Sequence, residues 1–259
     1  MSEIQVLVST MENDFDLHNR MDISDAVIIN QTTTDQPKVV TKNKVVYYNY
    51  NEKGLSVSRN RAISHSKSKI CIISDDDVKF KNKYEKAILK AYEDYPEADV
   101  IAFQVTRIGG ERNKTFCKVP KRLNRFTIMK VSSVEITFKR ESIVKNKIKF
   151  NPLFGAGAKF QMGEENLFLK DCLEKGLYIY YVPVEIAKVN MNTSSWFNGY
   201  GIKYFESKGA FFKAYSPILW PILNVQFLIR KRKVIKSDSL GFFSKLLAMT
   251  RGSIKFRIR

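Results

Sequence analysis

The hydrophobic positions divide the first two-thirds of the chain into alternating strand-like and helix-like segments. Two segments, at residues 54–68 and 82–96, carry apolar residues at helical spacing, which predicts two crossover helices. Strands that alternate with helices are typical of a mostly parallel sheet, so the pattern predicts an α/β fold. Five short apolar runs predict the strands, at residues 4–10, 25–31, 44–50, 69–74 and 99–105.

The pattern changes after the fifth predicted strand. Residues 107–133 are basic and polar, which indicates an excursion from the sheet, and residues 134–146 return as a strand and a short helix. A Gly-rich loop at 151–163 then leads into a helix at 164–176. A further strand is predicted at 177–189.

The C-terminal part is apolar first and basic afterwards. Residues 217–229 are strongly apolar but contain two prolines, and they fall short of the roughly 20 residues that span a bilayer. Residues 230–259 hold ten Lys and Arg residues against the single acid Asp238. This combination predicts an extension, residues 216–259, that lies on an anionic membrane surface. An amphipathic helix packed on its own domain, or on a partner subunit, is the alternative.

Composition narrows the class of protein. With 259 residues and 44% hydrophobic composition, the chain can bury a sizeable core and fits one α/β domain, residues 1–215, with an appendage. Its formal net charge of +18 requires an anionic partner, such as nucleic acid, anionic lipid or nucleotide phosphate. Three scattered cysteines and two histidines suggest neither a disulfide framework nor a zinc site. The first residues resemble no secretory signal, so we expect a cytosolic protein.

Three consecutive acids, Asp75, Asp76 and Asp77, follow directly on the apolar run at 70–74. Unpaired carboxylates are too costly to bury, so they mark the carboxyl end of a strand buried on both faces. Ligands bind at that edge of open α/β sheets, and a divalent cation that prefers oxygen ligands would neutralise such a cluster. A solvated acidic turn is the alternative.

A second acidic pair, Glu164 and Glu165, opens the helix after Gly163. Free N–H groups and the positive end of the helix dipole favour ionised carboxylates there, and an ionised carboxylate can accept a proton. Acids are also common at helix amino termini without any catalytic role. The position therefore allows a general base but does not require one.

Together these motifs resemble the family 2 glycosyltransferases with the GT-A fold, whose bacterial members build capsule, exopolysaccharide and O-antigen chains. The resemblance covers residues 4 to about 195, and it implies a Rossmann-like, mostly parallel sheet flanked by helices, followed here by a basic helical C-terminal extension. It rests on three stretches, VLVSTME, GLSVSRNRAISHSKSKICIISDDDV and FGAGAKFQMGEENLFLKDCLEKG, in the order usual for the family.

The resemblance implies a nucleotide site at the carboxyl ends of the first strands, where Thr10, Glu12 and Asn30 stand. It also implies that Arg59 faces the nucleotide or its phosphates. For either Arg59 or Arg61, an exposed helix face is the alternative.

The family's acidic motif holds Mn²⁺ or Mg²⁺ on the donor diphosphate, which carries this role onto Asp75, Asp76 and Asp77. Neighbouring residues of an extended chain point to opposite sides, so we expect Asp77, with either Asp75 or Asp76, to face the metal and the sugar. We assign Asp75 and Asp77 as the metal ligands, and we place Asp75 and Asp76 also at the nucleotide.

The second acidic motif of the family supplies the base, which implies that role for Glu165. The family usually has Asp at this position, and the departure leaves Glu164 as an alternative. Many relatives also place a histidine after the last strand, where this chain has none. Asn192, Thr193 or Ser194 would contact the diphosphate in its place.

The resulting prediction is a metal-dependent inverting glycosyltransferase that moves a sugar from a UDP-linked donor to a hydroxyl of a lipid-linked saccharide. We expect it in the cytoplasm, peripheral on the inner face of the cell membrane. A nucleic-acid-binding protein is an alternative, but the basic excess lies near the tail and no zinc-finger, RNP-like or heptad pattern occurs. A Mg²⁺-dependent nucleotidyltransferase is another, since it also pairs carboxylates with a metal.

Overall fold

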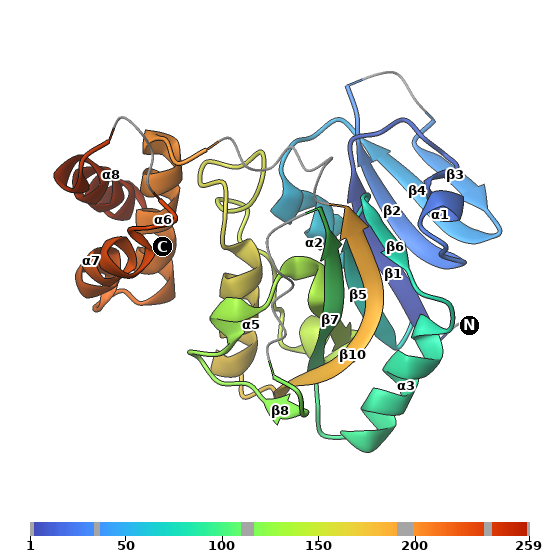
Figure 1. The fold of residues 1–259 in the computed structure, drawn as a ribbon. Helices are drawn as coiled ribbons and strands as arrows, with labels where there is room; N and C mark the ends of the chain where they lie inside the picture. The colour runs from blue at the N-terminus through green and yellow to red at the C-terminus, as the bar shows by residue number, and fades with distance from the viewer. Residues whose placement is uncertain (1–2, 34–36, 110–116, 191–198, 236–239, 258–259) are drawn as a thin grey trace.

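The computed structural model describes residues 3–33, 37–109, 117–190, 199–235 and 240–257. Its centre is a ten-stranded sheet in the order β3-β4-β2-β1-β5-β9-β7-β10-β6, with β8 paired to β10 (Figure 1). The strands are β1 (Ile4–Thr10), β2 (Asp25–Gln31), β3 (Val39–Lys42), β4 (Lys44–Tyr50), β5 (Ile70–Asp75), β6 (Val78–Phe80), β7 (Val100–Ile108), β8 (Lys121–Arg122), β9 (Ile136–Lys139) and β10 (Ile179–Asn190).

The sheet is parallel where the sequence predicts crossover helices. Strands β4, β2, β1 and β5 run parallel, and so do β7 and β10. Strand β9 runs antiparallel between β5 and β7, and β3 and β6 are antiparallel at the two ends. Every residue of β1 is buried, which explains why this strand reads as an uninterrupted apolar run. The predicted mostly parallel α/β sheet is confirmed.

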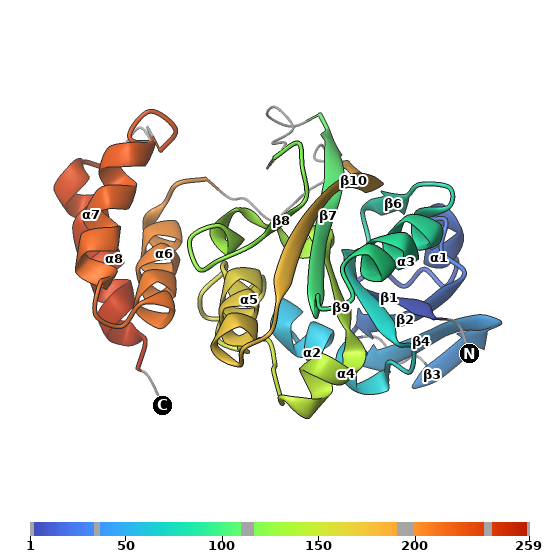
Figure 2. The same cartoon turned by 90° about the horizontal axis from the view of Figure 1, so that it is seen from below.

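Helices cover both faces of the sheet (Figure 2). One core cluster joins Leu7 of β1 to α2 and α5, and the other joins its neighbours Val6 and Val8 to α1 and α3. Alternate residues of one strand thus face opposite layers of helices. The helices are α1 (Leu17–Arg20), α2 (Leu55–His65), α3 (Tyr84–Asp94), α4 (Arg140–Lys145), α5 (Glu164–Glu174), α6 (Ile202–Tyr215), α7 (Trp220–Lys231) and α8 (Phe242–Lys255), with 3-10 turns at Ile128–Lys130 and Ser133–Glu135.

The last three helices pack together beside the α/β body, as both ribbon views show (Figures 1 and 2). Helices α6 and α8 approach closely because each presents a glycine at the crossing. A Cβ atom on Gly209 would stand 1.8 Å from the Met249 carbonyl oxygen, and one on Gly252 would stand 1.8 Å from that of Glu206. Helix α6 therefore belongs with α7 and α8, and the predicted boundary between residues 215 and 216 separates it from the helices on which it packs.

The helical unit is also joined to the body by aromatic contacts. The Phe256 ring lies 5.3 Å from that of Phe154 and 6.2 Å from that of Phe160, measured between centroids. Phe211 of α6 packs on Gly163, where an added Cβ would meet the ring at 2.4 Å. One face of the helical unit therefore packs on the α/β body, as the alternative interpretation of the C-terminal extension predicts. No helix in the described part of the chain is long and apolar enough to cross a bilayer.

Candidate active site

A cavity of about 890 Å³ opens at the carboxyl ends of β1 and β5. Parallel pairing sets Ser9 of β1 beside Asp75 of β5, so the residues that follow each strand arrive at the same edge of the sheet. Thr10, Asp76 and Asp77 all line the cavity. The aspartates thus stand at the end of a buried strand, as the sequence predicts, and ligand binding at this edge stays a prediction.

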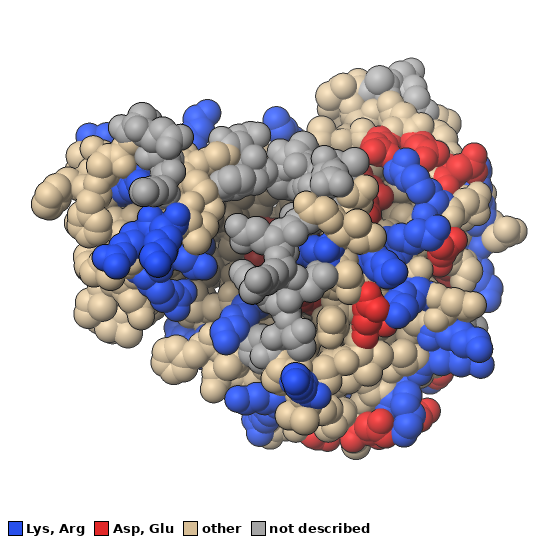
Figure 3. Space-filling view, viewed as in Figure 1, with Lys and Arg blue, Asp and Glu red and all other residues tan. Residues whose placement is uncertain are grey.

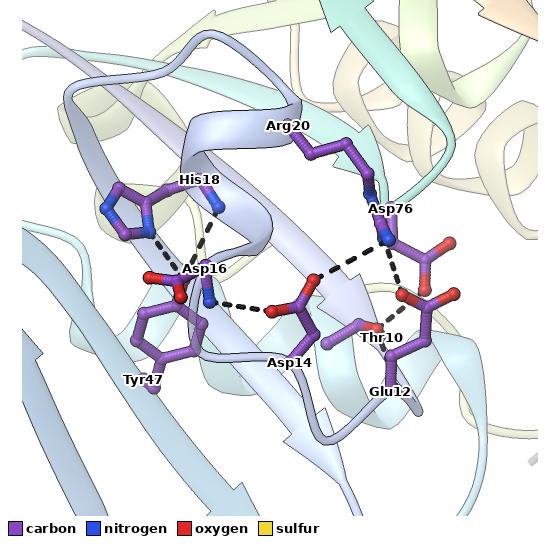
Figure 4. Close-up of polar contacts among 8 residues, drawn as sticks. All are labelled: Thr10, Glu12, Asp14, Asp16, His18, Arg20, Tyr47 and Asp76. Carbon is purple, nitrogen blue, oxygen red and sulfur yellow. Dashed lines mark hydrogen bonds and ion pairs between the residues drawn. The ribbon is translucent and has the colours of Figure 1, made fainter.

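Hydrogen bonds and ion pairs fix the mouth of the cavity (Figure 4). The Thr10 hydroxyl donates to Asp76 Oδ2 at 2.6 Å and accepts the backbone N–H of Glu12 at 3.0 Å. Arg20 reaches over from α1, with Nη2 at 2.5 Å from Glu12 Oε2 and Nη1 at 3.6 Å from Asp14 Oδ2. The cavity is therefore lined by acids and by at least one arginine that already carries acidic partners.

The two cavity aspartates have raised pKa values. Burial raises the pKa of Asp77 to about 6, and the nearby charges of Asp75 and Asp76 add to the shift. Burial also raises the pKa of Asp76, against the hydrogen bond from Thr10, which lowers it. Ionised carboxylates are thus unfavourable here without added positive charge.

The carboxylates of Asp76 and Asp77 are donors of the kind that a divalent cation prefers. No group of three or more His, Cys, Asp or Glu side chains in the described residues could hold a metal by itself. Mg²⁺, however, is commonly held by one or two carboxylates together with substrate phosphates. Asp76 and Asp77 would hold it in that way, because both line a cavity large enough for a nucleotide.

A buried arginine organises the floor beneath the cavity. Arg59 of α2 is 1% exposed, and its Nη2 donates to Asp75 Oδ1 at 2.9 Å while its Nη1 donates to Glu164 Oε1 at 2.8 Å. Asp75 is therefore engaged by Arg59 and does not line the cavity, which leaves Asp76 rather than Asp75 beside Asp77 as the candidate metal ligand. Arg61, on the exposed face of the same helix, pairs with Glu52 at 3.3 Å.

Glu165 lies in a different electrostatic setting from the one that its helix position predicts. The helix terminus favours an ionised carboxylate, but burial and the adjacent Glu164 together raise the pKa of Glu165 to about 8, against the opposing effects of Arg59 and Lys208. Burial in turn lowers the pKa of Lys208 to about 8. Burial therefore decides the direction of the pKa shift of Glu165, and the Glu165 carboxylate binds a proton more strongly than an ordinary glutamate does.

The loop before α5 connects this pair to the cavity. Gln161 and Gly157 line the cavity, and the Ala156 carbonyl oxygen accepts the N–H of Leu55 at the start of α2, at 2.9 Å. A Cβ added to Gly155 would stand 3.2 Å from the Glu164 carboxyl carbon, so this glycine allows the close approach of the loop to the acidic pair.

Most of the predicted site residues lie close together in the structure, but they fall into two groups. Thr10, Glu12, Asp76 and Asp77 line the cavity, whereas the buried Arg59 and Glu164 and the partly buried Asp75 form an ion-pair network outside the lining. Asn30 is also buried, and its amide donates to the side-chain oxygens of Asn13 and Asn49 at 3.1 and 2.9 Å. The candidates Asn192, Thr193 and Ser194 lie outside the described residues.

Sequence reasoning missed several cavity residues. Lys53 lies at a turn held by Gln31, whose side chain bonds both backbone groups of Gly54. Nothing in the local pattern distinguishes such polar residues from ordinary loop positions; only their nearness to strand ends, as for Gln31, is a usable signal. The missed residues are Ser9, Arg20, Gln31, Lys53, Lys79, Gln161 and Asn190.

This fold and this arrangement of acids define a GT-A type glycosyltransferase. The sequence model of glycosyl transferase family 2 matches residues 24–162, more than half of the chain, and the protein belongs to that family. A search of curated protein sequences finds no match.

Solved structures of S. aureus TarS share the fold. TarS 1–349 superposes with a TM-score of 0.66 at 14% identity, over 98% of this chain and 80% of that one. TarS 1–349 in complex with UDP-GlcNAc gives the same TM-score and identity over 98% and 81%. The complex with UDP gives a TM-score of 0.61 at 14% identity, over 92% and 76%.

Proposed function

We propose that this family 2 glycosyltransferase is a metal-dependent, inverting enzyme that transfers a sugar from a UDP-linked donor to a hydroxyl of a saccharide acceptor. The observation that carries the proposal is that one buried arginine joins the acidic cluster at the cavity to a second acidic cluster. Asp76 and Asp77 line the cavity, and Arg59 ties the neighbouring Asp75 to Glu164, the residue before the candidate base. The complexes of TarS with UDP and UDP-GlcNAc, at 14% identity, support a donor of the same class here.

On the donor side, the residues of this chain bind and orient the diphosphate. Asp76 and Asp77 would hold Mn²⁺ or Mg²⁺, which when bound stabilises the charge that develops on the departing UDP. Thr10 fixes the Asp76 carboxylate by its 2.6 Å hydrogen bond. Arg20 and Lys53 add positive charge to the cavity lining near this carboxylate pair.

On the acceptor side, Glu165 takes the proton of the attacking hydroxyl. We assign the base to Glu165 rather than Glu164 because Glu164 Oε1 accepts a 2.8 Å hydrogen bond from the buried Arg59, whose positive charge favours the ionised form of Glu164. The Glu165 carboxylate, with its pKa raised to about 8, binds a proton more strongly than an ordinary glutamate. A single displacement with one base and no covalent intermediate inverts the configuration of the sugar.

A thermal-shift screen of nucleotide sugars, with and without Mn²⁺, tests the proposal. A ligand present at 100 times its Kd stabilises the folded state by about 2.7 kcal/mol, so the true donor should raise the melting temperature only in company with the metal. Stabilisation by no nucleotide sugar would overturn the proposal. Release of pyrophosphate rather than UDP during turnover would identify a nucleotidyltransferase instead.

The acceptor belongs to the same proposal. We place the enzyme on the cytoplasmic face of the cell membrane, acting on a lipid-linked saccharide in the synthesis of a surface polysaccharide such as capsule. The support is the C-terminal segment 230–259, whose ten basic residues and one acid supply half of the formal net charge of +18. Binding to duplex DNA that falls steeply with salt would favour a nucleic-acid-binding protein.

A further inference from the structure

Helix α7 exposes an apolar stripe on the side that faces away from α6 and α8. Ile218, Ile222 and Ile229 are 86%, 66% and 57% exposed, and Val225 lies between the last two. Ile222, Val225 and Ile229 are spaced three and four residues apart, which places them along one face of the helix, and Ile218 lies in the turn that precedes it. The opposite face, with Asn224, Phe227 and Leu228, is buried in the helical unit.

The stripe lines a shallow groove with almost no polar surface. Pro221, Ile222, Val225 and Ile229 contribute its walls, together with the stems of Gln226 and Arg230. Isolated exposed apolar side chains are ordinary on protein surfaces, but a continuous row of β-branched residues on one helix face marks an interaction surface. The remaining question is what covers it.

The charge around the stripe is entirely positive. Arg230, Lys231, Arg232 and Lys233 follow the apolar face at its carboxyl end, and within the described residues none of them forms an ion pair. Figure 3 shows Lys and Arg side chains gathered over the C-terminal helices, whereas the acidic side chains visible in that view lie over the sheet. The surface thus combines an apolar row with a basic end.

This charge pattern selects one occupant. A two-fold dimer with parallel α7 helices would bring two copies of the same basic cluster together, and like charges across an interface cost several kcal/mol. An antiparallel pair would separate the two clusters but would give neither of them an anionic partner. An anionic bilayer instead offers hydrocarbon to the isoleucines and phosphate headgroups to the lysines and arginines. Helix α7 has 12 residues, too few to cross a bilayer, so it would lie in the plane of the interface.

We propose that the Ile222–Ile229 face of α7, together with Ile218 in the preceding turn and the basic carboxyl end of the helix, is the surface by which this protein lies on an anionic membrane. This inference rests on the proposed function in one respect, because it explains how a lipid-linked acceptor would be presented to the enzyme. This face makes the membrane contact, and another face of the helical unit packs on the α/β body.

Vesicle flotation of the full-length protein tests the surface. The probes are vesicles of phosphatidylcholine alone and vesicles with about 30% phosphatidylglycerol, which carry the anionic charge that basic segments bind. We expect the wild type to float with the anionic vesicles. Ile222→Ser with Ile229→Ser should lower its partition at least about tenfold at unchanged charge. Arg232→Gln with Lys233→Gln should lower it about tenfold on anionic vesicles only.

The matched control removes apolar surface elsewhere. Val144 and Val184 are 45% and 40% exposed on the α/β body, and Val144→Ser with Val184→Ser should float like the wild type. Flotation of the Ile222/Ile229 variant equal to wild type would overturn the proposal. So would a concentration-dependent dimer, formed without lipid, that this variant abolishes.

Calorimetric titration with UDP and Mn²⁺ separates this proposal from the proposed function. All three double variants should bind UDP like the wild type, because the mutated residues lie outside the cavity lining. A wild type that floats but binds no nucleotide would leave the membrane surface standing and refute the donor assignment. The reverse result would refute only the membrane surface.

Discussion

Two clusters of adjacent acids meet at the candidate site, and their electrostatic settings differ. Asp76 and Asp77 line an open cavity, and their pKa values are raised because burial and mutual repulsion oppose ionisation. Glu164 and Glu165 lie at a helix start beside a buried guanidinium, Arg59, whose charge offsets part of the same cost. In the proposed function the first pair takes a cation from outside, whereas the second has a guanidinium beside it in the fold.

Arg59 contacts both acidic clusters. Arg59 bonds Glu164 and Asp75, one member from each acidic cluster, and so fixes these two carboxylates in place. In the proposed mechanism the neighbours Glu165 and Asp76 then serve the acceptor proton and the donor diphosphate. The arginine thus joins the two halves of the site without being part of the cavity lining.

The largest expected effect comes from removing the base. Glu165→Gln preserves shape but cannot accept a proton, so we expect turnover to fall about 10²–10⁴-fold while UDP binding is kept. Steady-state kinetics and calorimetry measure the two quantities. Glu164→Gln is the matched control on the neighbouring residue. Normal turnover in Glu165→Gln together with loss in Glu164→Gln would assign the base to Glu164.

The next effect is on the fold. Arg59→Met leaves Asp75 and Glu164 buried without their shared cation, and we expect the free energy of unfolding to fall by about 3 kcal/mol. Denaturant unfolding measures it, and Arg61→Met, on the exposed face of the same helix, should cost at most about 0.5 kcal/mol.

Rescue sharpens this prediction. Asp75→Asn with Glu164→Gln in the Arg59→Met background removes the stranded charges and should recover part of the lost stability. An Arg59→Met protein as stable as the wild type would show that the buried pairs contribute nothing net.

The sequence predicts the strands of the sheet well, but it does not predict the ion pairs inside the site. Strands such as β1 and β5 are buried on both faces, so their apolar runs are unmistakable, whereas the edge strand β3 has no fully buried residue and β8 has two exposed residues. The family resemblance selects Asp76 and Asp77, which line the cavity, and the role of Glu165 stays a prediction.

What the sequence could not predict depends on contacts between distant residues. Arg59 and Glu164 are 105 positions apart, and helical phase alone does not distinguish Arg59 from Arg61. Equally, the pKa of Glu165 is set by burial in the assembled fold, which outweighs the helix terminus visible in the sequence. Local pattern thus locates the acids, but only tertiary packing assigns their charge states.

A smaller effect is expected at the metal pair. Asp77→Asn should weaken metal-dependent UDP binding about 10–100-fold, a loss typical of perturbed metal sites. Without metal the same change should raise the melting temperature, because the ionised carboxylate is disfavoured where it stands.

The pH dependence gives an independent measurement on the wild type. The metal needs the ionised carboxylate, so UDP affinity in Mn²⁺ should fall as the pH is lowered through about 6. Undiminished Mn²⁺-dependent affinity in Asp77→Asn would refute the metal role of this residue.

The smallest effect concerns the built-in charges around Glu165. Lys208 of α6 lies near this carboxylate from the helical unit, with its amine 5.0 Å from the Phe211 ring centroid, and its positive charge lowers the pKa of Glu165. The other charges that act on Glu165 are Glu164 and Arg59, and Lys208 itself also meets the charges of Arg230 and Lys231.

Because transfer needs the ionised base, the rate in the wild type should rise with pH up to about 8, the pKa of Glu165. Lys208→Met removes a nearby positive charge, so the pKa of Glu165 rises further and the acid limb of the pH–rate profile moves to higher pH. The difference should be largest below pH 8, where Lys208 is charged, and it should shrink above it. Lys213→Met, on the same helix with its amine over Trp220, is the matched control and should leave the profile in place. A Lys208→Met protein that loses stability but keeps the wild-type profile would reduce Lys208 to a packing role, and the second acidic pair would then rely on Arg59 alone.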